Sequence, residues 1–212
     1  MNKKIGITLR IENIEKYNEK RDAISHDWVK FLKSSNSIPI LIPNNLNNVR
    51  QFLDELKLDG FILSGGDNKG DNIERDYTEK EIIEFSIEKK IPMFGVCRGM
   101  QVINDFFGGE LNTVKDSSHV AKRHNILLTD TNFQKLLQSD KIEVNSFHNN
   151  IIKKESLGNN LQDFAISEKD NTVEGFFHKD LPIIGVMWHP EREKNFQNDL
   201  KLFNKVFGEK VE

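Results

Sequence analysis

Short apolar runs alternate with helical patterns along the N-terminal half of this 212-residue sequence. The apolar runs predict strands, and the segments between them predict helices. Strands that alternate with helices pair in parallel through right-handed crossovers, which gives an α/β fold with an open, doubly wound sheet. Ligands of such sheets bind beyond the carboxyl ends of the strands. The predicted strands are residues 4–9, 38–42, 60–64 and 92–96, and the predicted helices are residues 17–32, 47–56, 78–89 and 100–107.

The pattern changes from about Asn125, where strand-like runs follow one another with few helices between them. We expect these runs to extend the same sheet in antiparallel fashion. A closing amphipathic helix is predicted over residues 195–207. No linker interrupts the chain, so residues 1–212 are expected to form a single domain. The predicted strands of this part are residues 125–129, 142–147, 164–167, 173–177 and 183–188.

Charge and cysteine content exclude several classes of protein. The net charge is −3 with both signs interspersed, so no surface for nucleic acid is expected. No apolar run reaches the length that spans a membrane, and the N-terminus lacks the apolar region of a secretory signal. The single cysteine allows no internal disulfide. We therefore expect a soluble, cytoplasmic protein with no membrane partner.

The one cysteine lies in Gly95-Val-Cys-Arg-Gly99, between a predicted strand and a predicted helix. Two glycines at a sharp strand-to-helix turn let the backbone pass close to itself, so the central side chain stands exposed above the sheet edge. The N-terminus of the following helix also favours a thiolate. A lone cysteine is more often a small buried hydrophobe, but this context predicts that Cys97 is a nucleophile.

The segment Trp188-His-Pro-Glu191 can supply a base and a group that orients it. Proline keeps the preceding His189 out of the helical region, and residues i and i+2 of an extended segment project to the same side. The side chains of His189 and Glu191 should therefore meet at the end of another apolar strand. The alternative is a His-Pro turn with a solvated glutamate. Together with the cysteine turn, the segment predicts a Cys97–His189–Glu191 triad.

Paired glycines follow the third predicted strand, in Ser64-Gly65-Gly66. At a strand end they allow a backbone amide to turn toward the site. The amide of Gly66 and that of Arg98, directly after the nucleophile, would form an oxyanion hole with two donors. An ordinary Gly-Gly turn is the alternative.

These three motifs, in this order and spacing, resemble those of the class I glutamine amidotransferases, the triad-type glutaminases with a flavodoxin-like sheet. Within that superfamily the chain resembles the free-standing γ-glutamyl hydrolase branch, which includes γ-glutamyl-γ-aminobutyrate hydrolases. The resemblance covers nearly the full chain and implies a flavodoxin-like, mainly parallel sheet with an antiparallel C-terminal extension. Further matching pieces are Gly6-Ile-Thr8, Arg75-Asp76 with Glu79, Asn104 with Gly108-Gly109, and Val144-Asn-Ser-Phe-His148.

The resemblance implies that the Cys97 thiolate attacks the γ-carbonyl of a glutamyl amide, while His189 protonates the leaving nitrogen and then activates water. Glu191 would fix the imidazole and stabilise its charged form. No cofactor is expected, and no metal, because the sequence shows no cluster of metal ligands. By the same resemblance, the glutamyl amino and carboxylate groups would be recognised by Gln101, Asn145, Ser146, Phe147 and His148.

The amine half of the substrate is less well defined by the sequence. The loop of residues 66–71 is short, and Asn149-Asn150 replace the His-Gln that this branch often carries, so the pattern departs from the γ-aminobutyrate type. A compact relative in the branch hydrolyses γ-glutamyl-CDP-amidate during capsule modification, and that substrate is the most specific expectation. Candidate contacts for its pyrophosphate are Arg98, Lys69, Lys122 and Arg123.

Three further histidines have no assigned role. His119 and His124 lie where this branch often has histidines and could contact the leaving group, but a solvated loop is an equal alternative. His178 is predicted to be an exposed residue at a strand end.

The first predicted helix also allows two interpretations. Arg21, Ser25 and Trp28 would share one of its faces, near His26. Either this face contacts substrate at the mouth of the site, or the segment is a surface helix with one buried tryptophan.

Three functions remain open at this point. The leading hypothesis is a stand-alone, cysteine-dependent hydrolase whose partner is a small-molecule γ-glutamyl amide. A glutaminase subunit would instead pass ammonia to a separate synthetase, and that partner would accelerate glutamine hydrolysis. The third is a non-catalytic binding or scaffold protein, although such a protein has no need of all three triad residues. The sequence leaves the oligomeric state open.

Overall fold

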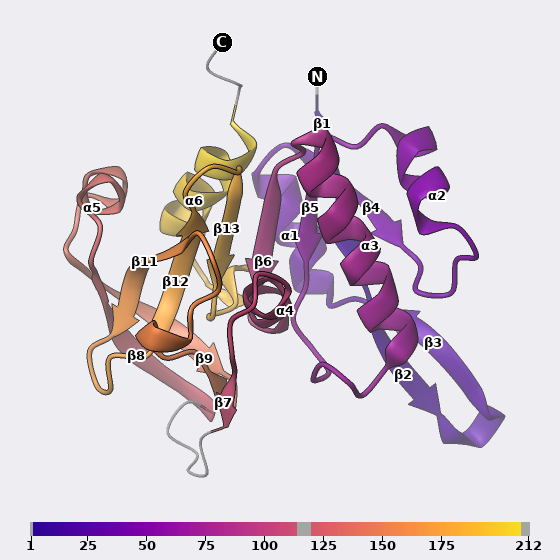
Figure 1. Ribbon diagram of the computed structural model, residues 1–212, viewed down its shortest axis with the longest axis horizontal. Coiled ribbons are helices and arrows are strands. Elements are labelled where there is room, and N and C mark those ends of the chain that lie inside the picture. Colours follow the sequence, from indigo (N-terminus) through magenta and orange to yellow (C-terminus); the bar gives the residue numbers. More distant parts are fainter. Residues whose placement is uncertain (1, 114–119, 209–212) are drawn as a thin grey trace.

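Nine strands form one sheet in the computed structural model, which describes residues 2–113 and 120–208 (Figure 1). The first five strands across the sheet run parallel to one another, and each of the remaining four is antiparallel to its neighbours. This confirms the predicted α/β class, with a mainly parallel sheet and an antiparallel extension. In their order across the sheet, the strands are β4 (Ser37–Ile42), β1 (Lys3–Thr8), β5 (Gly60–Leu63), β6 (Met93–Val96), β13 (Ile183–Val186), β12 (Val173–His178), β11 (Leu161–Ser167), β8 (Val120–Leu128) and β9 (Lys141–Phe147).

Helices cover both faces of the sheet, as double winding requires. One hydrophobic cluster joins the sheet to α1 (His26–Ser34), α5 (Thr131–Leu137) and α6 (Gln197–Phe207). The other joins it to α2 (Val49–Leu56), α3 (Ile73–Lys89) and α4 (Arg98–Phe106). In Figure 1, α3 lies in front of the sheet and α1 behind it. No helix within the described residues has both the length and the apolar character needed to cross a membrane.

The prediction of a helix over residues 17–32 is wrong in its first half. Residues 10–23 form a β-hairpin that projects from the fold, with β2 (Arg10–Ile14) antiparallel to β3 (Glu19–Ala23) (Figure 1). Asn18 turns the chain with φ +48°, in the left-handed region that asparagine tolerates better than most residues.

The helix itself starts later than predicted because Ser25 caps it. The Ser25 hydroxyl accepts a hydrogen bond from the N–H of Asp27 at 3.3 Å, and α1 begins at His26. Arg21 is therefore part of the hairpin and shares no helical face with Ser25 and Trp28. Residues 26–34 match the second interpretation of the segment, a surface helix with a buried Trp28 and an exposed His26.

Smaller differences concern element boundaries and one histidine. α3 begins at Ile73, earlier than its predicted start, and α5 was not predicted. Two short strands, β7 (Asn112–Thr113) and β10 (Asn150–Ile151), pair with each other outside the main sheet. The prediction of an exposed His178 is wrong. Its Nδ1 accepts hydrogen bonds from the N–H groups of Asp180 and Leu181 at 3.0 and 3.1 Å, and the side chain is buried.

Candidate active site

Three neighbouring parallel strands end at one edge of the sheet and carry the motifs singled out in the sequence. β5 leads into the Ser64–Gly66 loop, β6 into Cys97, and β13 into residues 187–191. β6 lies between the other two, so the three segments are adjacent. The N–H of Cys97 donates to the carbonyl oxygen of Val186 at 2.8 Å, which joins the ends of β6 and β13.

Cys97 occupies a strained turn between β6 and α4. Its backbone angles are φ +51° and ψ −106°, a combination that residues other than glycine rarely adopt and that is typical of functional sites. The helix then passes so close to β5 that a Cβ on Gly99 would lie 2.0 Å from the carbonyl oxygen of Leu63. Only glycine fits at that approach. The turn therefore has the geometry of the predicted nucleophile elbow, with Cys97 at the N-terminus of α4.

His189 lies between the other two members of the predicted triad. Its Nδ1 is 2.8 Å from Oε1 of Glu191. A Cβ built on Gly65 would lie 2.7 Å from His189 Cε1 and 3.6 Å from the Cβ of Cys97, so the imidazole and the thiol share the space above that glycine. All three side chains are buried, so the prediction that the Cys97 side chain stands exposed above the sheet edge is wrong. The structure thus brings Cys97, His189 and Glu191 together, and the alternative of a solvated glutamate does not hold.

The electrostatics of this group favour a thiolate beside an imidazolium. Burial by itself would raise the pKa of the Cys97 thiol, but the hydrogen bond with His189 and the charges of His189 and His148 lower it below its ordinary value. Burial would likewise lower the pKa of His189, yet its hydrogen bonds with Cys97 and Glu191 raise it to about 9. Each group stabilises the charged form of the other, which is the condition for a reactive cysteine near neutral pH.

A buried ionic network supports the two loops that would supply the oxyanion donors. At its centre is Glu79 on α3, which accepts hydrogen bonds from Thr8 Oγ1 at 2.9 Å and from Arg75 Nε at 3.0 Å. The other carboxylate oxygen of Glu79 pairs with the guanidinium of Arg98. Thr8 in turn accepts a hydrogen bond from the N–H of Ser64 at 3.0 Å. One carboxylate therefore connects β1, the Ser64–Gly66 loop and the cysteine turn.

Arg75 holds the glycine loop from behind. Its Nη2 donates to the carbonyl oxygens of Ser64 at 2.8 Å and of Gly65 at 3.1 Å. Gly66 has φ +127°, a conformation that a larger residue would adopt only with strain. Sequence reasoning noted Arg75 and Glu79 only as matching pieces of a family pattern, and the structure shows that they hold the loop in place.

The residues expected to recognise the glutamyl group differ in their contacts. Gln101 is buried on α4, and its Nε2 lies 3.6 Å from the sulfur of Met187. Ser146 is buried on β9. The partly exposed ring of Phe147 meets the His189 ring edge-on, with 5.7 Å between the ring centroids. Phe147 is therefore placed to contact a substrate that lies over the imidazole.

Asn145 acts on the backbone of the base. Its Nδ2 donates to the carbonyl oxygen of His189 at 2.8 Å, and its Oδ1 accepts from the N–H of His189 at 3.0 Å. The same Nδ2 donates to Glu193 Oε1 at 2.6 Å. The Asn145 side chain therefore fixes the backbone of His189, a role that the sequence did not suggest.

His148 belongs to a buried charged cluster that sequence reasoning missed. The carboxylate of Glu174, on β12, has Oε1 at 3.6 Å from His148 Nε2 and at 3.4 Å from His124 Nε2. Burial would lower the pKa of His148, but the hydrogen bond and charge of Glu174 raise it. Burial would raise the pKa of Glu174, but the two histidines lower it. The Glu174 carboxylate thus favours the charged form of His148, whose charge acts on Cys97. The sequence signal for this cluster was a glutamate inside an apolar run.

These histidines also bear on two open questions from the sequence. His124 lies on β8 with its ring directed at Glu174, which argues against a solvated loop at that position. His119 lies outside the described residues. In the part of the chain that the structure describes, no three His, Cys, Asp or Glu side chains are grouped so as to hold a metal ion.

Most of the basic residues expected at a pyrophosphate are already paired with carboxylates. The guanidinium of Arg98 is buried between Glu79 and Asp76, so its side chain is not directed to a substrate. Lys69 pairs with Asp105. Lys122 is exposed on β8. Arg123 lies 2.8 Å from Glu143 and 3.0 Å from Glu193.

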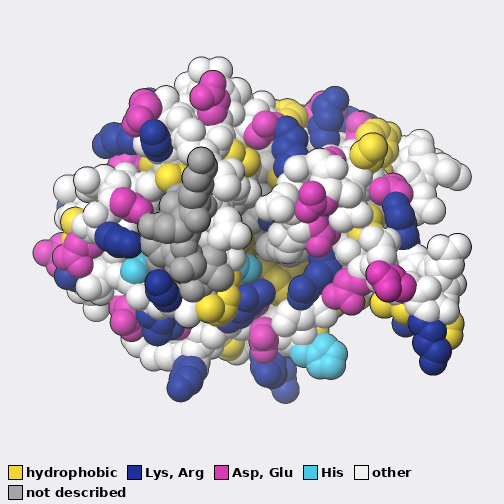
Figure 2. Space-filling model, turned by 90° about the horizontal axis from the view of Figure 1, so that it is seen from below, with side chains coloured by type: hydrophobic (Ala, Val, Ile, Leu, Met, Phe, Trp, Pro, Cys, Tyr) yellow, Lys and Arg dark blue, Asp and Glu magenta, His cyan; other side chains and the backbone are white. Residues whose placement is uncertain are grey.

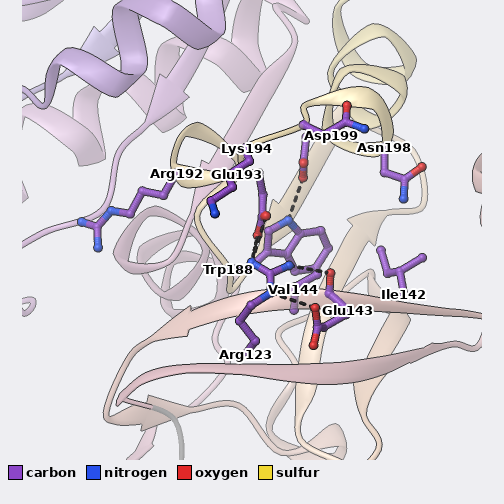
Figure 3. A pocket seen from close by; sticks show the side chains of 11 residues that line it. Arg123, Ile142, Glu143, Val144, Trp188, Arg192, Glu193, Lys194, Asn198 and Asp199 are labelled. Carbon is purple, nitrogen blue, oxygen red and sulfur yellow. Dashed lines mark hydrogen bonds and ion pairs between the residues drawn. The ribbon is translucent and has the colours of Figure 1, made fainter.

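A separate pocket of about 350 Å³ lies beside Trp188, the residue before His189 (Figure 3). None of the three triad side chains lines it. The indole N–H of Trp188 donates to Asp199 Oδ1 at 2.8 Å, and burial raises the pKa of this aspartate to about 7. Arg123 bridges two glutamates at the same pocket, as Figure 3 shows.

The comparison with known families agrees with this geometry. The model of the peptidase C26 family matches residues 4–191, a span that includes Cys97, His189 and Glu191. The chain belongs to the peptidase C26 family. Membership of this family, whose proteins are class I glutamine amidotransferase-like, confirms the resemblance inferred from the sequence motifs.

Relatives of this peptidase C26 protein include hydrolases and glutamine-hydrolysing components of synthases. The γ-glutamyl-CDP-amidate hydrolase of Campylobacter jejuni is 33% identical over 205 residues, which cover 92% of each chain. The glutamine-hydrolysing GMP synthase subunit of Methanosphaera stadtmanae is 33% identical over 181 residues, which cover 85% of this chain and 86% of that protein.

Solved structures show the same fold. A protein described as a GMP synthase subunit from Thermoplasma acidophilum superposes with a TM-score of 0.71 at 23% identity, over 98% of this chain and 94% of that one. A glutamine amidotransferase from Thermotoga maritima gives a TM-score of 0.65 at 16% identity, over 90% and 77%. At these identities the likeness shows the fold alone, which is that of class I glutamine amidotransferases.

Proposed function

We propose that this peptidase C26 protein hydrolyses γ-glutamyl amides, with Cys97 as the nucleophile, and releases glutamate and an amine. The observation that carries the proposal is the buried pair of Cys97 and His189, oriented by Glu191 and set on a strained turn. A non-catalytic scaffold would have no use for a thiol whose pKa is lowered and whose backbone is strained.

The proposed reaction has two steps, and the same side chains act in both. In the first, the Cys97 sulfur bonds to the γ-carbonyl carbon. The carbon–nitrogen bond then breaks as His189 gives its proton to the leaving nitrogen, which leaves a thioester. In the second step His189 takes a proton from water, the hydroxide attacks the thioester, and glutamate departs from the regenerated thiolate. The amides of Gly66 and Arg98 would hold the oxyanion in both steps.

The glutamyl group would lie on the side of the triad that faces β9 and α4. Phe147 supplies an apolar surface beside His189, and Gln101 and Ser146 supply polar groups. His148 is the candidate partner for the α-carboxylate, because it is buried beside Glu174, which favours its charged form, and because its charge acts on Cys97.

The amine half is proposed to be CDP-amidate, with a role in capsule modification in the cytoplasm. The support is the likeness to the Campylobacter jejuni γ-glutamyl-CDP-amidate hydrolase over 92% of both chains, together with the short loop of residues 66–71. γ-Glutamyl-γ-aminobutyrate is the alternative substrate of the same reaction.

The test is glutamate release from three compounds: L-glutamine, γ-glutamyl-γ-aminobutyrate and γ-glutamyl-CDP-amidate. The matched control is Cys97→Ala, which removes only the sulfur. We expect a strong preference for γ-glutamyl-CDP-amidate and no release by the variant. An active Cys97→Ala protein would end the proposal, and a preference for the γ-aminobutyrate compound would correct its amine half.

A glutaminase subunit is the second candidate, and the similarity to the GMP synthase subunit of Methanosphaera stadtmanae favours it. It predicts Cys97-dependent hydrolysis of free glutamine that accelerates when an ATP-dependent synthetase is added. Co-purification of the protein with a synthetase from the native host, followed by the assay of glutamine hydrolysis with that synthetase, decides between a stand-alone hydrolase and a glutaminase subunit. Rapid turnover of γ-glutamyl-CDP-amidate by the isolated protein would exclude this candidate.

A further inference from the structure

Two of the seven arginines lie farther than the other five from the nearest carboxylate oxygen among the described residues. In Arg21, Arg50, Arg75, Arg98 and Arg123, a guanidinium nitrogen lies 3.0 Å or less from a carboxylate oxygen. The corresponding distances are 3.9 Å from Arg10 to Glu12 and 3.7 Å from Arg192 to Glu191. Both exceed the length of a direct hydrogen bond. Within residues 2–113 and 120–208, each guanidinium group forms only a long ion pair with a neighbouring glutamate, which leaves hydrogen-bond donors for another acceptor.

Both arginines line one narrow cavity beside the triad. Other walls of this cavity are His189, Gly65 and Gly66, which are the candidate base and the loop with the candidate oxyanion donor. Arg10 reaches it from the first position of β2, and a Cβ on Gly66 would lie 3.2 Å from the Arg10 Cβ. Arg192 reaches it from the position after the triad acid. Two segments that are far apart in the sequence thus each bring an arginine to the cavity that His189 lines.

Both guanidinium groups remain accessible to a ligand. The side chain of Arg10 is 34% exposed and that of Arg192 is 33% exposed. Arg192 lies over the ring of Phe147, with 4.6 Å from its guanidinium carbon to the ring centroid. Arg192 is also one of the residues that line the pocket beside Trp188 (Figure 3). Figure 2 views the carboxyl edge of the parallel strands and shows Lys and Arg side chains on both sides of an apolar floor.

We propose that Arg10 and Arg192 bind a negatively charged group on the amine half of the substrate. The inference rests on the proposed function, because the cavity adjoins the imidazole that would protonate the leaving nitrogen. The cavity itself has a volume of only about 20 Å³, so the anion would lie at its mouth, against the exposed guanidinium groups and within a few bonds of that nitrogen. A phosphoryl group bonded to the nitrogen meets this condition, whereas a carboxylate at the end of a flexible chain does not. Guanidinium groups bind such oxygens through two parallel hydrogen bonds.

The test compares substrates that differ in the charge next to the scissile nitrogen. Values of kcat/KM are measured for γ-glutamyl-CDP-amidate, γ-glutamyl-γ-aminobutyrate and glutamine with Arg10→Gln, Arg192→Gln and the double variant. The control is Arg21→Gln, on the other strand of the same hairpin, which removes an exposed arginine outside the cavity. Each test variant should lower the ratio of the CDP-amidate value to the glutamine value by about tenfold or more, the effect of a lost hydrogen bond to a charged group. Arg21→Gln should keep the wild-type ratio.

The possible outcomes separate the inference from the proposed function. If the arginine variants lower kcat/KM equally for all three compounds, or leave the ratio of the CDP-amidate value to the glutamine value unchanged, the proposed role of the arginines is overturned. A larger loss for the γ-aminobutyrate compound would overturn the assignment of a phosphoryl group.

If the wild-type protein releases glutamate from none of the three, the proposed function fails, and binding still decides the inference. The affinity of the Cys97→Ala protein for γ-glutamyl-CDP-amidate is then measured by calorimetry. If adding Arg10→Gln or Arg192→Gln to the Cys97→Ala protein weakens this affinity by about tenfold, the result supports the proposed anion site. Equal affinities overturn it.

Discussion

At the scale of single residues, the charge state of Cys97 follows from the groups around it. His189 and His148 together outweigh the cost of burial and hold the pKa of the thiol below its ordinary value. We therefore expect the rate of alkylation by iodoacetamide to reach half of its maximum at a lower pH than for an ordinary thiol. Replacing the imidazole in His189→Gln should move that midpoint to higher pH, because the positive partner is lost.

Unfolded protein provides the control for this measurement, since the same thiol then titrates without its neighbours. The prediction fails if the folded and unfolded proteins have the same midpoint. It also fails if His189→Gln leaves the midpoint of the folded protein unchanged.

Asp199 connects a buried carboxyl group to folding stability. Burial raises its pKa to about 7, above the ordinary value of about 3.9 expected in the unfolded chain. The folded state therefore keeps the proton longer. The contribution of Asp199 to the free energy of unfolding is therefore fully present below its pKa in the unfolded chain. It is lost as the pH rises through about 7.

The Asp199→Asn variant tests this dependence, because it keeps an acceptor for the Trp188 indole N–H but does not titrate. We expect its free energy of unfolding in urea to fall less between pH 5 and pH 8 than that of the wild-type protein. Parallel pH profiles for the two proteins would contradict the assignment.

At the scale of elements, α3 supports the active site through Glu79. Glu79→Gln would leave Arg75 and Arg98 buried without their shared carboxylate, at a cost of about 3 kcal/mol in the free energy of unfolding. The loops that hold the oxyanion donors should then loosen. We expect kcat for glutamate release to fall by about 10²-fold, which is the effect of losing one oxyanion donor. Alkylation of Cys97 needs no oxyanion hole and should change much less.

Glu84→Gln is the matched control, because Glu84 is on the same helix and its partner Lys80 is 3.7 Å away at the surface. Both variants are assayed at a temperature where circular dichroism shows them folded. Equal losses of turnover and of alkylation in Glu79→Gln would show that it disturbs the thiol itself rather than the oxyanion loops.

The elements that the sequence predicted are those whose own residues carry a clear pattern. β5 and β6 are continuous apolar runs because both of their faces are buried. The hairpin of residues 10–23 has no such signal, because none of the β3 side chains is buried. Pairing with β2 and the turn at Asn18 decide its conformation. α5 is only seven residues long, too short for a helical period to be recognised.

The same distinction applies to the candidate site. Cys97, His189 and Glu191 could be found from the sequence because each lies in a short motif at a strand end. Arg10 and Glu174 could not, because they reach the site from other strands and only the folded chain brings them close. Arg10 has the local sequence context of an ordinary surface residue, and the local signal for Glu174 is only its place inside an apolar run.

At the scale of the whole molecule, the single nine-stranded sheet predicts one cooperative unfolding transition. The two tryptophans can report on it separately, since Trp28 lies on α1 and Trp188 follows β13. We expect the fluorescence midpoints of Trp28→Phe and Trp188→Phe to coincide with the midpoint of each variant by far-ultraviolet circular dichroism. Separate midpoints for the two probes would contradict a single domain over residues 1–212.

The position of β13 in the sheet also determines when activity can arise during synthesis. β13 comes late in the chain but lies between β6 and β12, and it leads into His189 and Glu191. A chain growing on the ribosome exposes Cys97 well before these residues exist. Until β13 inserts, the thiol has neither its base nor a closed sheet around it, so its reactivity is that of an ordinary cysteine. We therefore expect the Cys97 thiol to gain its reactivity only as the fold is completed, so that a prematurely terminated chain carries no activated thiol.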